Sequence, residues 1–170
     1  MARVLDIGCY NYKTDGAIGI DILKNADADI RASIYALPFW EHFDVITMLE
    51  VLEHLETPLE ALRIIRNVLK PNGLLILSVP NMLSIDCMLR FAIFGRLTCS
   101  EEHIYSWTIA ELKNIVARAG FDITYLGFTT PTQYYRAGRL RRLFRFIPRL
   151  SHKSILIKAR PTQALRIEEK

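Results

Sequence analysis

Residues 4–9 read Val4-Leu5-Asp6-Ile7-Gly8-Cys9, and residues 19–22 read Gly19-Ile20-Asp21-Ile22. Both are short apolar runs rich in β-branched residues, as in the buried strands of a parallel sheet. A glycine after the first strand lets a ligand approach the backbone, and a carboxylate that closes the second can accept both hydroxyl hydrogens of an adenosine ribose. Taken alone, each has a simpler interpretation, because Gly8 can be a turn residue and Asp21 a helix cap.

Apolar runs of this kind recur along the chain and alternate with segments of helical period. This alternation is typical of parallel strands that are joined by crossover helices. It predicts an α/β fold in which a seven-stranded, mostly parallel sheet has helices on both faces. The expected strands are residues 3–7, 17–22, 29–32, 43–49, 74–79, 121–128 and 154–159.

Two helices have start and stop signals in the sequence. Thr57-Pro58-Leu59-Glu60 and Thr108-Ile109-Ala110-Glu111 each place a threonine three residues before a glutamate, which predicts a capping box at both starts. We expect the first helix to end at Pro71-Asn72-Gly73 and the second at Gly120. The apolar segment Met82–Leu97 predicts a further helix or lid, and its composition favours core packing over a substrate cover.

The connection between the first two strands is short. After Gly8, only the eight residues Cys9–Gly16 precede the second strand, fewer than the roughly 10–12 residues of a crossover that contains a helix. We therefore expect the first helix to be shortened or absent. The residues Tyr10–Lys13 either contact the ligand or complete a tight loop.

Length and composition indicate one soluble domain. The chain has 170 residues, of which 51% are apolar, and we expect a domain over residues 1–160 with a frayed tail at 161–170. The three cysteines, Cys9, Cys87 and Cys99, lack the spacing of a disulfide framework or a zinc site, so we expect neither a disulfide nor a metal. No export signal or integral membrane segment is visible, and a cytoplasmic location is expected.

Charge is distributed unevenly along the chain. Residues 1–135 have a net charge of −5 and residues 136–170 one of +9, within a total of +4. Five arginines between Arg139 and Arg149 alternate with leucine and phenylalanine in a basic amphipathic stretch. This stretch is either a solvated, structural connection or a surface that recruits an anionic acceptor, whereas the acidic body disfavours nucleic acid as a partner.

Further motifs follow the first two strands. They are Leu37-Pro38-Phe39, Phe43-Asp44-Val45-Ile46, Glu50-Val51-Leu52-Glu53-His54, Leu69-Lys70-Pro71-Asn72-Gly73, Val79-Pro80-Asn81 and Ala119-Gly120-Phe121. In this order the series resembles the class I S-adenosylmethionine-dependent methyltransferases, in particular the type 11-like enzymes that act on small molecules. The resemblance extends from Val4 to about Phe128. It implies a Rossmann-like sheet, methyltransferase activity and S-adenosylmethionine as the cofactor.

The resemblance also implies a set of cofactor-binding residues. Asp6 and Gly8 would line the methionine end of the cofactor, and Asp21 would bind the ribose hydroxyls. The other members of the set are Cys9 and Ile22 beside these residues, Ser33 and Ile34 at the adenine, and Leu49 and Glu50 beneath the reactive sulfonium.

Two histidines are candidate catalytic bases. His54 follows the fourth expected strand, and His103 precedes the helix at Thr108, where the family often has a substrate-side histidine. Either could accept a proton from a hydroxyl acceptor, but a packing or orienting role explains each of them at least as well.

We therefore predict methyl transfer by direct displacement from S-adenosylmethionine to an unidentified small-molecule or lipid-linked acceptor. The alternative is a catalytically inactive module of the same fold that binds S-adenosylmethionine or a partner, which the shortened first connection favours. Nothing precedes the first strand, so we expect an open cofactor cleft. Met82–Tyr105, a second copy in a homodimer or a partner protein would cover it.

Overall fold

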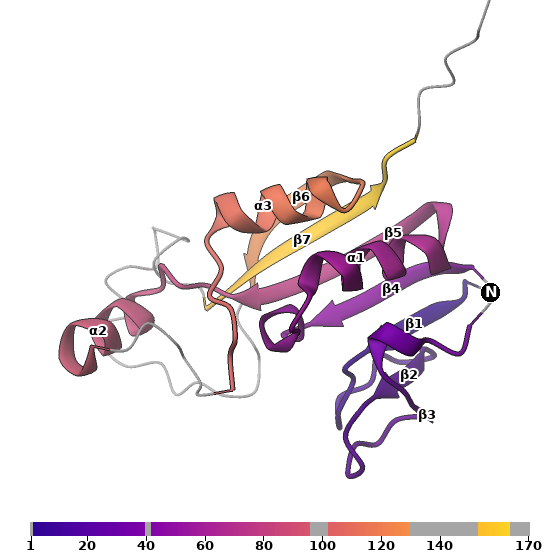
Figure 1. Cartoon of the computed structure of the whole chain (residues 1–170), viewed down its shortest axis with the longest axis horizontal. Coiled ribbons are helices and arrows are strands. Elements are labelled where there is room, and N and C mark those ends of the chain that lie inside the picture. Colours follow the sequence, from indigo (N-terminus) through magenta and orange to yellow (C-terminus); the bar gives the residue numbers. More distant parts are fainter. Residues whose placement is uncertain (1, 40–41, 96–101, 130–152, 164–170) are drawn as a thin grey trace, which may run out of the picture.

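Seven strands form one sheet in the computed structural model, which describes residues 2–39, 42–95, 102–129 and 153–163. They are β1 (Val4–Ile7), β2 (Ile18–Asp21), β3 (Ile30–Arg31), β4 (Phe43–Leu49), β5 (Leu69–Pro80), β6 (Phe121–Thr129) and β7 (Ser154–Pro161). Their order across the sheet is β3-β2-β1-β4-β5-β7-β6 (Figure 1). Strands β1 to β5 pair in parallel, whereas β7 is antiparallel to both of its neighbours. The predicted seven-stranded, mostly parallel sheet is confirmed.

The strand bounds follow the predictions closely, except in β5. Strand β4 occupies the predicted Phe43–Leu49, but β5 already begins at Leu69, where the sequence predicts the end of a helix. Leu69 pairs with Phe43, and the register between β4 and β5 shifts between Phe43 and Val45. The expected stop signal Pro71-Asn72-Gly73 therefore lies inside a strand. The helix ends earlier because the chain already pairs with β4 at Leu69, before the proline.

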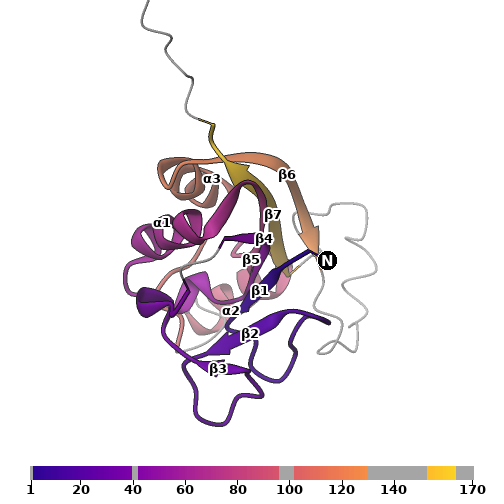
Figure 2. The same cartoon turned by 90° about the vertical axis from the view of Figure 1, so that its right-hand side faces the viewer.

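Helices α1 (Pro58–Val68) and α3 (Ile109–Arg118) lie side by side on one face of the sheet (Figures 1 and 2). Leu62 and Ile65 of α1 and Leu112 and Val116 of α3 are fully buried. Their spacing of three or four residues places them on one apolar face of each helix, which is turned inward. The apolar side chains of these helices and of the central strands form one hydrophobic core, which fixes the carboxyl ends of the strands.

One of the two predicted capping boxes is present. Thr108 Oγ1 accepts a hydrogen bond from the Glu111 N–H, and Glu111 Oε2 accepts one from the Thr108 N–H. At Thr57 the prediction is wrong, because the hydroxyl bonds Glu60 Oε2 at 3.1 Å and makes no hydrogen bond to the helix backbone. Gly120 follows α3 with a φ of +84°, as its predicted left-handed role requires.

The connection between β1 and β2 contains no helix, as predicted. The Tyr10 N–H donates to Asp21 Oδ2 at 2.9 Å, and the Lys13 ammonium pairs with Asp29 at 2.8 Å. Asp29 also accepts a hydrogen bond from the Gly19 N–H. The carboxylates of Asp21 and Asp29 thus fix this connection, where a longer connection would be fixed by helix packing.

Helix α2 (Ile85–Phe94) projects beyond the carboxyl end of β5 (Figure 1). The Ser84 hydroxyl caps its start by accepting a hydrogen bond from the Cys87 N–H. The expectation of core packing is wrong here, because most of the apolar side chains that the structure describes on this helix are exposed and do not pack on the core. Its exposed apolar side chains are Met88, Leu89, Phe91, Ile93 and Phe94. Cys87 is disulfide-bonded, which corrects the expectation of unpaired cysteines.

The carboxyl-terminal part of the fold extends beyond residue 160. Strand β7 includes Pro161, and the Thr162 N–H donates to the Gly120 carbonyl at 2.9 Å. The first residues of the expected frayed tail are therefore held by the sheet. The basic stretch from Arg139 to Arg149 lies outside the described residues. Among those described, no helix is long and apolar enough to cross a membrane.

Candidate cofactor site and active site

A cavity of about 770 Å³ opens where β1, β2 and β4 end. The walls come from five chain segments that are distant in sequence but adjacent at this edge, four of them because parallel strands bring their carboxyl ends together. Six of the predicted cofactor residues line the cavity: Gly8, Asp21, Ile22, Ser33, Ile34 and Glu50. Most of the predicted cofactor residues therefore lie together at one cavity.

Gly8 lies at the wall of the cavity in a conformation that favours glycine. Its φ is +70°, and its N–H donates to the Ile20 carbonyl at 2.9 Å. A Cβ at this position would lie 2.3 Å from Val51 Cγ2. A side chain here would both strain the backbone and displace the opposite wall.

Asp21 is held rigidly at the end of β2. Its side chain is largely buried, and its two oxygens accept hydrogen bonds from the Tyr10 and Leu23 N–H groups at 2.9 and 2.8 Å. Each carboxylate oxygen can accept a second hydrogen bond. Asp21 is thus a positioned acceptor pair at the cavity wall, and no helix follows it that it could cap.

The far side of the cavity combines apolar surface with a polar edge. Ser33 Oγ accepts a hydrogen bond from the Tyr35 N–H and caps the short 3₁₀ helix η1 (Ile34–Ala36). Ile34 is buried, whereas Ile22, which also lines the cavity, is exposed. Such an environment suits a flat heteroaromatic ring with polar edges.

Glu50 marks the end of β4 and has a strained backbone. Its φ of +56° is unusual for a residue with a side chain and is often found at functional sites. The Ser78 hydroxyl donates to Glu50 Oε1 at 2.6 Å. Burial raises the pKa of this carboxyl above its usual value, although the hydrogen bond opposes the shift.

Three predicted cofactor residues do not line the cavity. Asp6 is buried on β1, where its oxygens accept hydrogen bonds from the Thr47 hydroxyl at 2.6 Å and the Thr14 N–H at 2.7 Å. Cys9 is a buried free thiol, and burial followed by the charge of Asp6 raises its pKa. Leu49 is half exposed and lies outside the lining. Through the hydrogen bond from Thr14, Asp6 stabilises the connection between β1 and β2. Side chains alternate between the two faces of a strand, and that of Asp6 does not line the cavity.

Sequence reasoning missed several residues that line the same cavity. Val51 and Leu55 flank the short 3₁₀ helix η2 (Leu52–His54), and Glu102 comes from a segment about 50 positions further along the chain. Val51 and Leu55 adjoin a recognised motif and could have been included on that ground. No local pattern marks Glu102, because only the tertiary fold brings it to the cavity.

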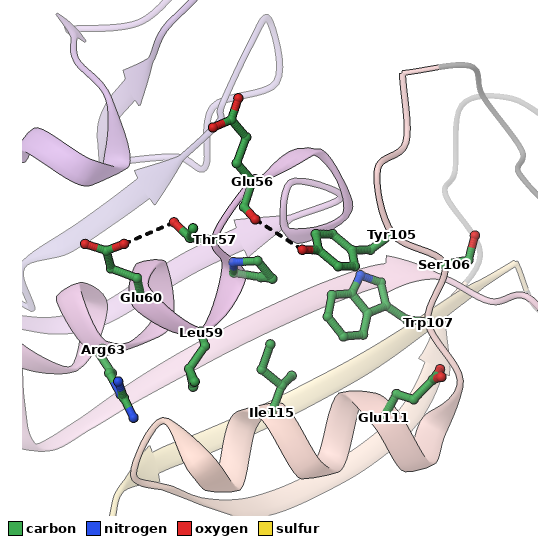
Figure 3. Close-up of a pocket in the computed structure, with 11 residues that line it drawn as sticks. Glu56, Thr57, Leu59, Glu60, Arg63, Tyr105, Ser106, Trp107, Glu111 and Ile115 are labelled. Atoms are coloured by element: carbon green, nitrogen blue, oxygen red, sulfur yellow. Dashed lines mark hydrogen bonds between the residues drawn. The ribbon is translucent and has the colours of Figure 1, made fainter.

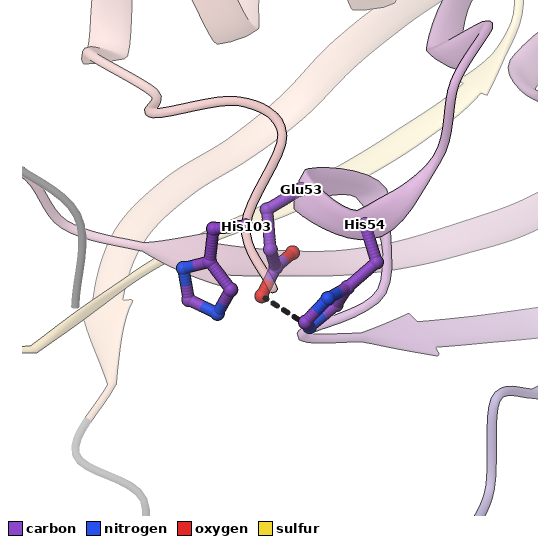
Figure 4. Close-up of side chains that lie close together, drawn as sticks. All are labelled: Glu53, His54 and His103. Atoms are coloured by element: carbon purple, nitrogen blue, oxygen red, sulfur yellow. Dashed lines mark ion pairs between the residues drawn. The ribbon is translucent and has the colours of Figure 1, made fainter. Parts of the chain in front are cut away.

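Glu53, His54 and His103 form a second group beside the cavity, here called the Glu53 cluster (Figure 4). His54 Nε2 lies 3.9 Å from Glu53 Oε1, and the two imidazole rings meet edge to face with centroids 4.7 Å apart. His54 also lines the cofactor cavity. The two candidate catalytic histidines of the sequence are thus brought together, along with a carboxylate that was not singled out.

The Glu53 cluster has unusual electrostatics. Burial raises the pKa of the Glu53 carboxyl to about 8, and the nearby charge of Glu50 contributes to the shift. Burial and the proximity of His54 lower the pKa of His103. Perturbed groups of this kind gather at functional sites more often than elsewhere.

A separate groove lies between the start of α1 and α3 (Figure 3). Its volume is about 620 Å³, and Tyr105 stacks on Trp107 at one end with ring centroids 5.5 Å apart. The Tyr105 hydroxyl donates to the Glu56 carbonyl. None of the predicted cofactor residues lines this groove, which adjoins the candidate site at Glu56, a residue that lines both.

Residues 1–126 match a family model described as a methyltransferase domain. The chain belongs to this methyltransferase family. The class I resemblance and the predicted enzyme class are thereby confirmed, and the cofactor is S-adenosylmethionine. The cavity lining fits this cofactor, because it combines the buried Asp21 carboxylate, which can accept further hydrogen bonds, with the apolar side chain of Ile34.

Solved structures with the same fold include several methyltransferases. A Haloferax volcanii methyltransferase in complex with the Trm112 methyltransferase activator has a TM-score of 0.68 at 15% identity, covering 96% of this chain and 83% of that one. An S-adenosylmethionine-dependent methyltransferase from Archaeoglobus fulgidus has a TM-score of 0.65 at 20% identity, covering 94% and 86%. One from Mesorhizobium loti has a TM-score of 0.61 at 16% identity, covering 94% and 90%. At these identities the similarity concerns the fold.

One curated relative is similar over a short region. The ubiquinone biosynthesis O-methyltransferase of Histophilus somni is 51% identical over 51 residues. The matched region is 30% of this chain and only 20% of that protein. The match supports a methyltransferase but does not identify the acceptor.

Proposed function

We propose that this methyltransferase transfers the methyl group of S-adenosylmethionine to a hydroxyl oxygen of a small-molecule or lipid-linked acceptor. The proximity of the Glu53 cluster to the cofactor cavity is the observation that supports this proposal most directly, because His54 belongs to both. An oxygen acceptor has to lose a proton during transfer, and polar groups near its oxygen assist that loss. The short match to an O-methyltransferase is a second, independent support.

We assign the cofactor-binding roles from the cavity lining. Asp21 accepts hydrogen bonds from the ribose hydroxyls, and Ser33 and Ile34 contact the adenine. The backbone of Gly8 contacts the methionine end, and Glu50 lies near the sulfonium. The negative charge of Glu50, when ionised, would favour a positively charged cofactor over its neutral product.

The protein contributes chiefly by alignment. S-adenosylmethionine supplies a methyl group on a positively charged sulfur that is itself a good leaving group. The residues around the cavity have to hold the acceptor oxygen and the methyl carbon in line at about 3–3.5 Å, which can lower the barrier by several kcal/mol. The rigid strand ends and the short first connection provide such positioning.

A labelled-methyl assay tests the choice of acceptor atom. The full chain is incubated with S-adenosylmethionine that carries a labelled methyl group and with matched acceptors: a catechol, the corresponding diamine, the dithiol and the methyl-blocked catechol. The proposal predicts label in the catechol product and none with the blocked catechol. Transfer to the amine or thiol alone would contradict the assignment of an oxygen acceptor.

Further parts of the sequence interpretation stay proposals. An anionic acceptor rests on the basic stretch beyond residue 135, which lies outside the described residues. A homodimer or partner protein over the cleft is supported only by a structural relative that was solved with its activator. A cytoplasmic location and a single domain over residues 1–160 are also proposals that rest on the sequence. Sedimentation of the full chain, alone and with S-adenosylmethionine, would test the homodimer.

A further inference from the structure

The Glu53 carboxylate is buried without a hydrogen-bond partner. Its side chain is 1% exposed, and neither Oε1 nor Oε2 accepts a hydrogen bond within the described residues. Burying an unsatisfied carboxyl group is costly, and the great majority of buried polar side chains in proteins have a partner. Such an exception indicates that a group binds there, or that the carboxyl is held neutral.

The neighbours of Glu53 are the side chains that metal ions prefer. One carboxylate oxygen of Glu53 and one ring nitrogen each of His54 and His103 all lie within 4.8 Å of one another. Ligand distances of about 2.0–2.2 Å place two ligand atoms of one ion about 3–3.5 Å apart. The 3.9 Å between His54 Nε2 and Glu53 Oε1 therefore needs to shorten by only about half an ångström.

The backbone holds the two halves of the cluster together. The Glu53 carbonyl accepts hydrogen bonds from the Ile104 and Tyr105 N–H groups at 2.9 and 3.1 Å, directly after His103. His54 Nδ1 lies 3.2 Å from the Glu102 carbonyl. In the tautomer that donates Nδ1–H to this carbonyl, the lone pair of Nε2 faces Glu53, which is how backbone carbonyls orient histidine ligands of metals.

We propose that Glu53, His54 and His103 bind a divalent transition-metal ion of the Zn²⁺ or Fe²⁺ type. Two imidazoles and one carboxylate form a ligand set that suits such ions and leaves coordination positions open. The sequence predicts no metal, since that expectation rests on cysteine spacing alone. The three ligands lie on two segments 49 positions apart, so no local motif reveals them.

His54 lines the wall of the cofactor cavity, so an ion held by the Glu53 cluster would lie beside that cavity. Resting on the proposed function, the inference is that the ion binds the acceptor hydroxyl and lowers its pKa. The hydroxyl proton leaves to water, and an oxygen lone pair forms the new bond to the methyl carbon. The carbon–sulfur bond breaks with its electron pair staying on sulfur, which gives a methyl ether and neutral S-adenosylhomocysteine.

Metal binding is measured without any acceptor, so that its outcome is independent of the proposed function. The full chain is stripped with a chelator and titrated with Zn²⁺ by calorimetry and with Co²⁺ by visible absorption. The variants are Glu53→Gln, which keeps the size of the side chain, and His103→Asn. His42→Asn is the matched control, because His42 is exposed and lies at the opposite end of β4.

We expect one ion per chain, with an affinity that falls at least about tenfold in Glu53→Gln and His103→Asn and is unchanged in His42→Asn. Zn²⁺ should raise the melting temperature of the wild type but not of the two cluster variants. Because Glu53→Gln can alter folding, His103→Asn with a native circular dichroism spectrum is the decisive variant. Absence of stoichiometric binding, or equal affinity in His103→Asn, would overturn the metal site, whereas metal binding without catechol methylation would overturn only the proposed acceptor.

Discussion

Replacement of Asp21 by asparagine tests the placement of the cofactor. The substitution keeps the shape of the side chain but removes its charge and replaces one acceptor oxygen by a donor NH₂ group. Asp21 would otherwise accept hydrogen bonds from the ribose at the cavity wall. Losing charge-assisted hydrogen bonds costs about 1.5–3 kcal/mol. The Kd for S-adenosylmethionine should therefore rise about 10- to 150-fold in Asp21→Asn.

Calorimetry with two ligands separates a ribose contact from a general effect of charge. S-adenosylmethionine and S-adenosylhomocysteine share the ribose, but only the former has a positive sulfur. If Asp21 binds the ribose, Asp21→Asn weakens both ligands equally, whereas a long-range charge effect weakens only the positive one. Asp15→Asn, an exposed aspartate of the neighbouring loop, is the control. An unchanged Kd in a folded Asp21→Asn protein would refute the reasoning.

Three further substitutions test the fold around the site. Gly8→Ala should destabilise the protein more than Gly16→Ala in urea unfolding, because both residues have a positive φ but only the first new Cβ meets a neighbouring valine; equal losses would contradict this. Thr108→Ala should cost about 0.5–2 kcal/mol of unfolding free energy, and Thr57→Ala clearly less, since only Thr108 caps a backbone N–H. A backbone N–H and a lysine ammonium lower the pKa of Asp44, so its stabilising effect is present above its unfolded pKa and is lost as the pH falls through its lower folded pKa; Asp44→Asn should flatten the acid limb of the stability curve, and an unaltered limb would count against this role.

Local sequence patterns were sufficient for the sheet and for several of the residues that line the candidate cofactor cavity. The first two strands could be predicted because each apolar run ends in a residue with a special requirement, glycine for a positive φ and aspartate for an acceptor. The short distance between them excludes a helix whatever its composition. These features depend on chain length and residue type, which the sequence contains directly.

Features that depend on competing tertiary contacts could not be predicted in this way. Thr57 and Thr108 have the same local pattern, but the Thr57 hydroxyl bonds a glutamate side chain instead of the helix backbone. Asp6 resembles a cofactor residue by position, yet its oxygens are already used by Thr47 and by the first connection.

The Glu53 cluster is the clearest limit of local reasoning. The sequence marks His54 and His103 as separate candidates, but their distance along the chain follows no ligand spacing, and nothing connects His103 with Glu53. Hydrogen bonds from the segment after His103 to the Glu53 carbonyl, and the contact of His54 Nδ1 with the Glu102 carbonyl, bring them together. Tertiary structure is therefore required to recognise this group at all.

The central claim is that S-adenosylmethionine binds in the cavity at the carboxyl ends of β1, β2 and β4. A crystal structure of the full chain with S-adenosylhomocysteine tests it most directly. The account predicts ribose hydroxyls within hydrogen-bond distance of the Asp21 carboxylate, with the adenine against Ile34 and the amino-acid end next to Gly8. Density for the ligand in the groove beside Tyr105 and Trp107, or an empty cavity at saturating ligand, would contradict it.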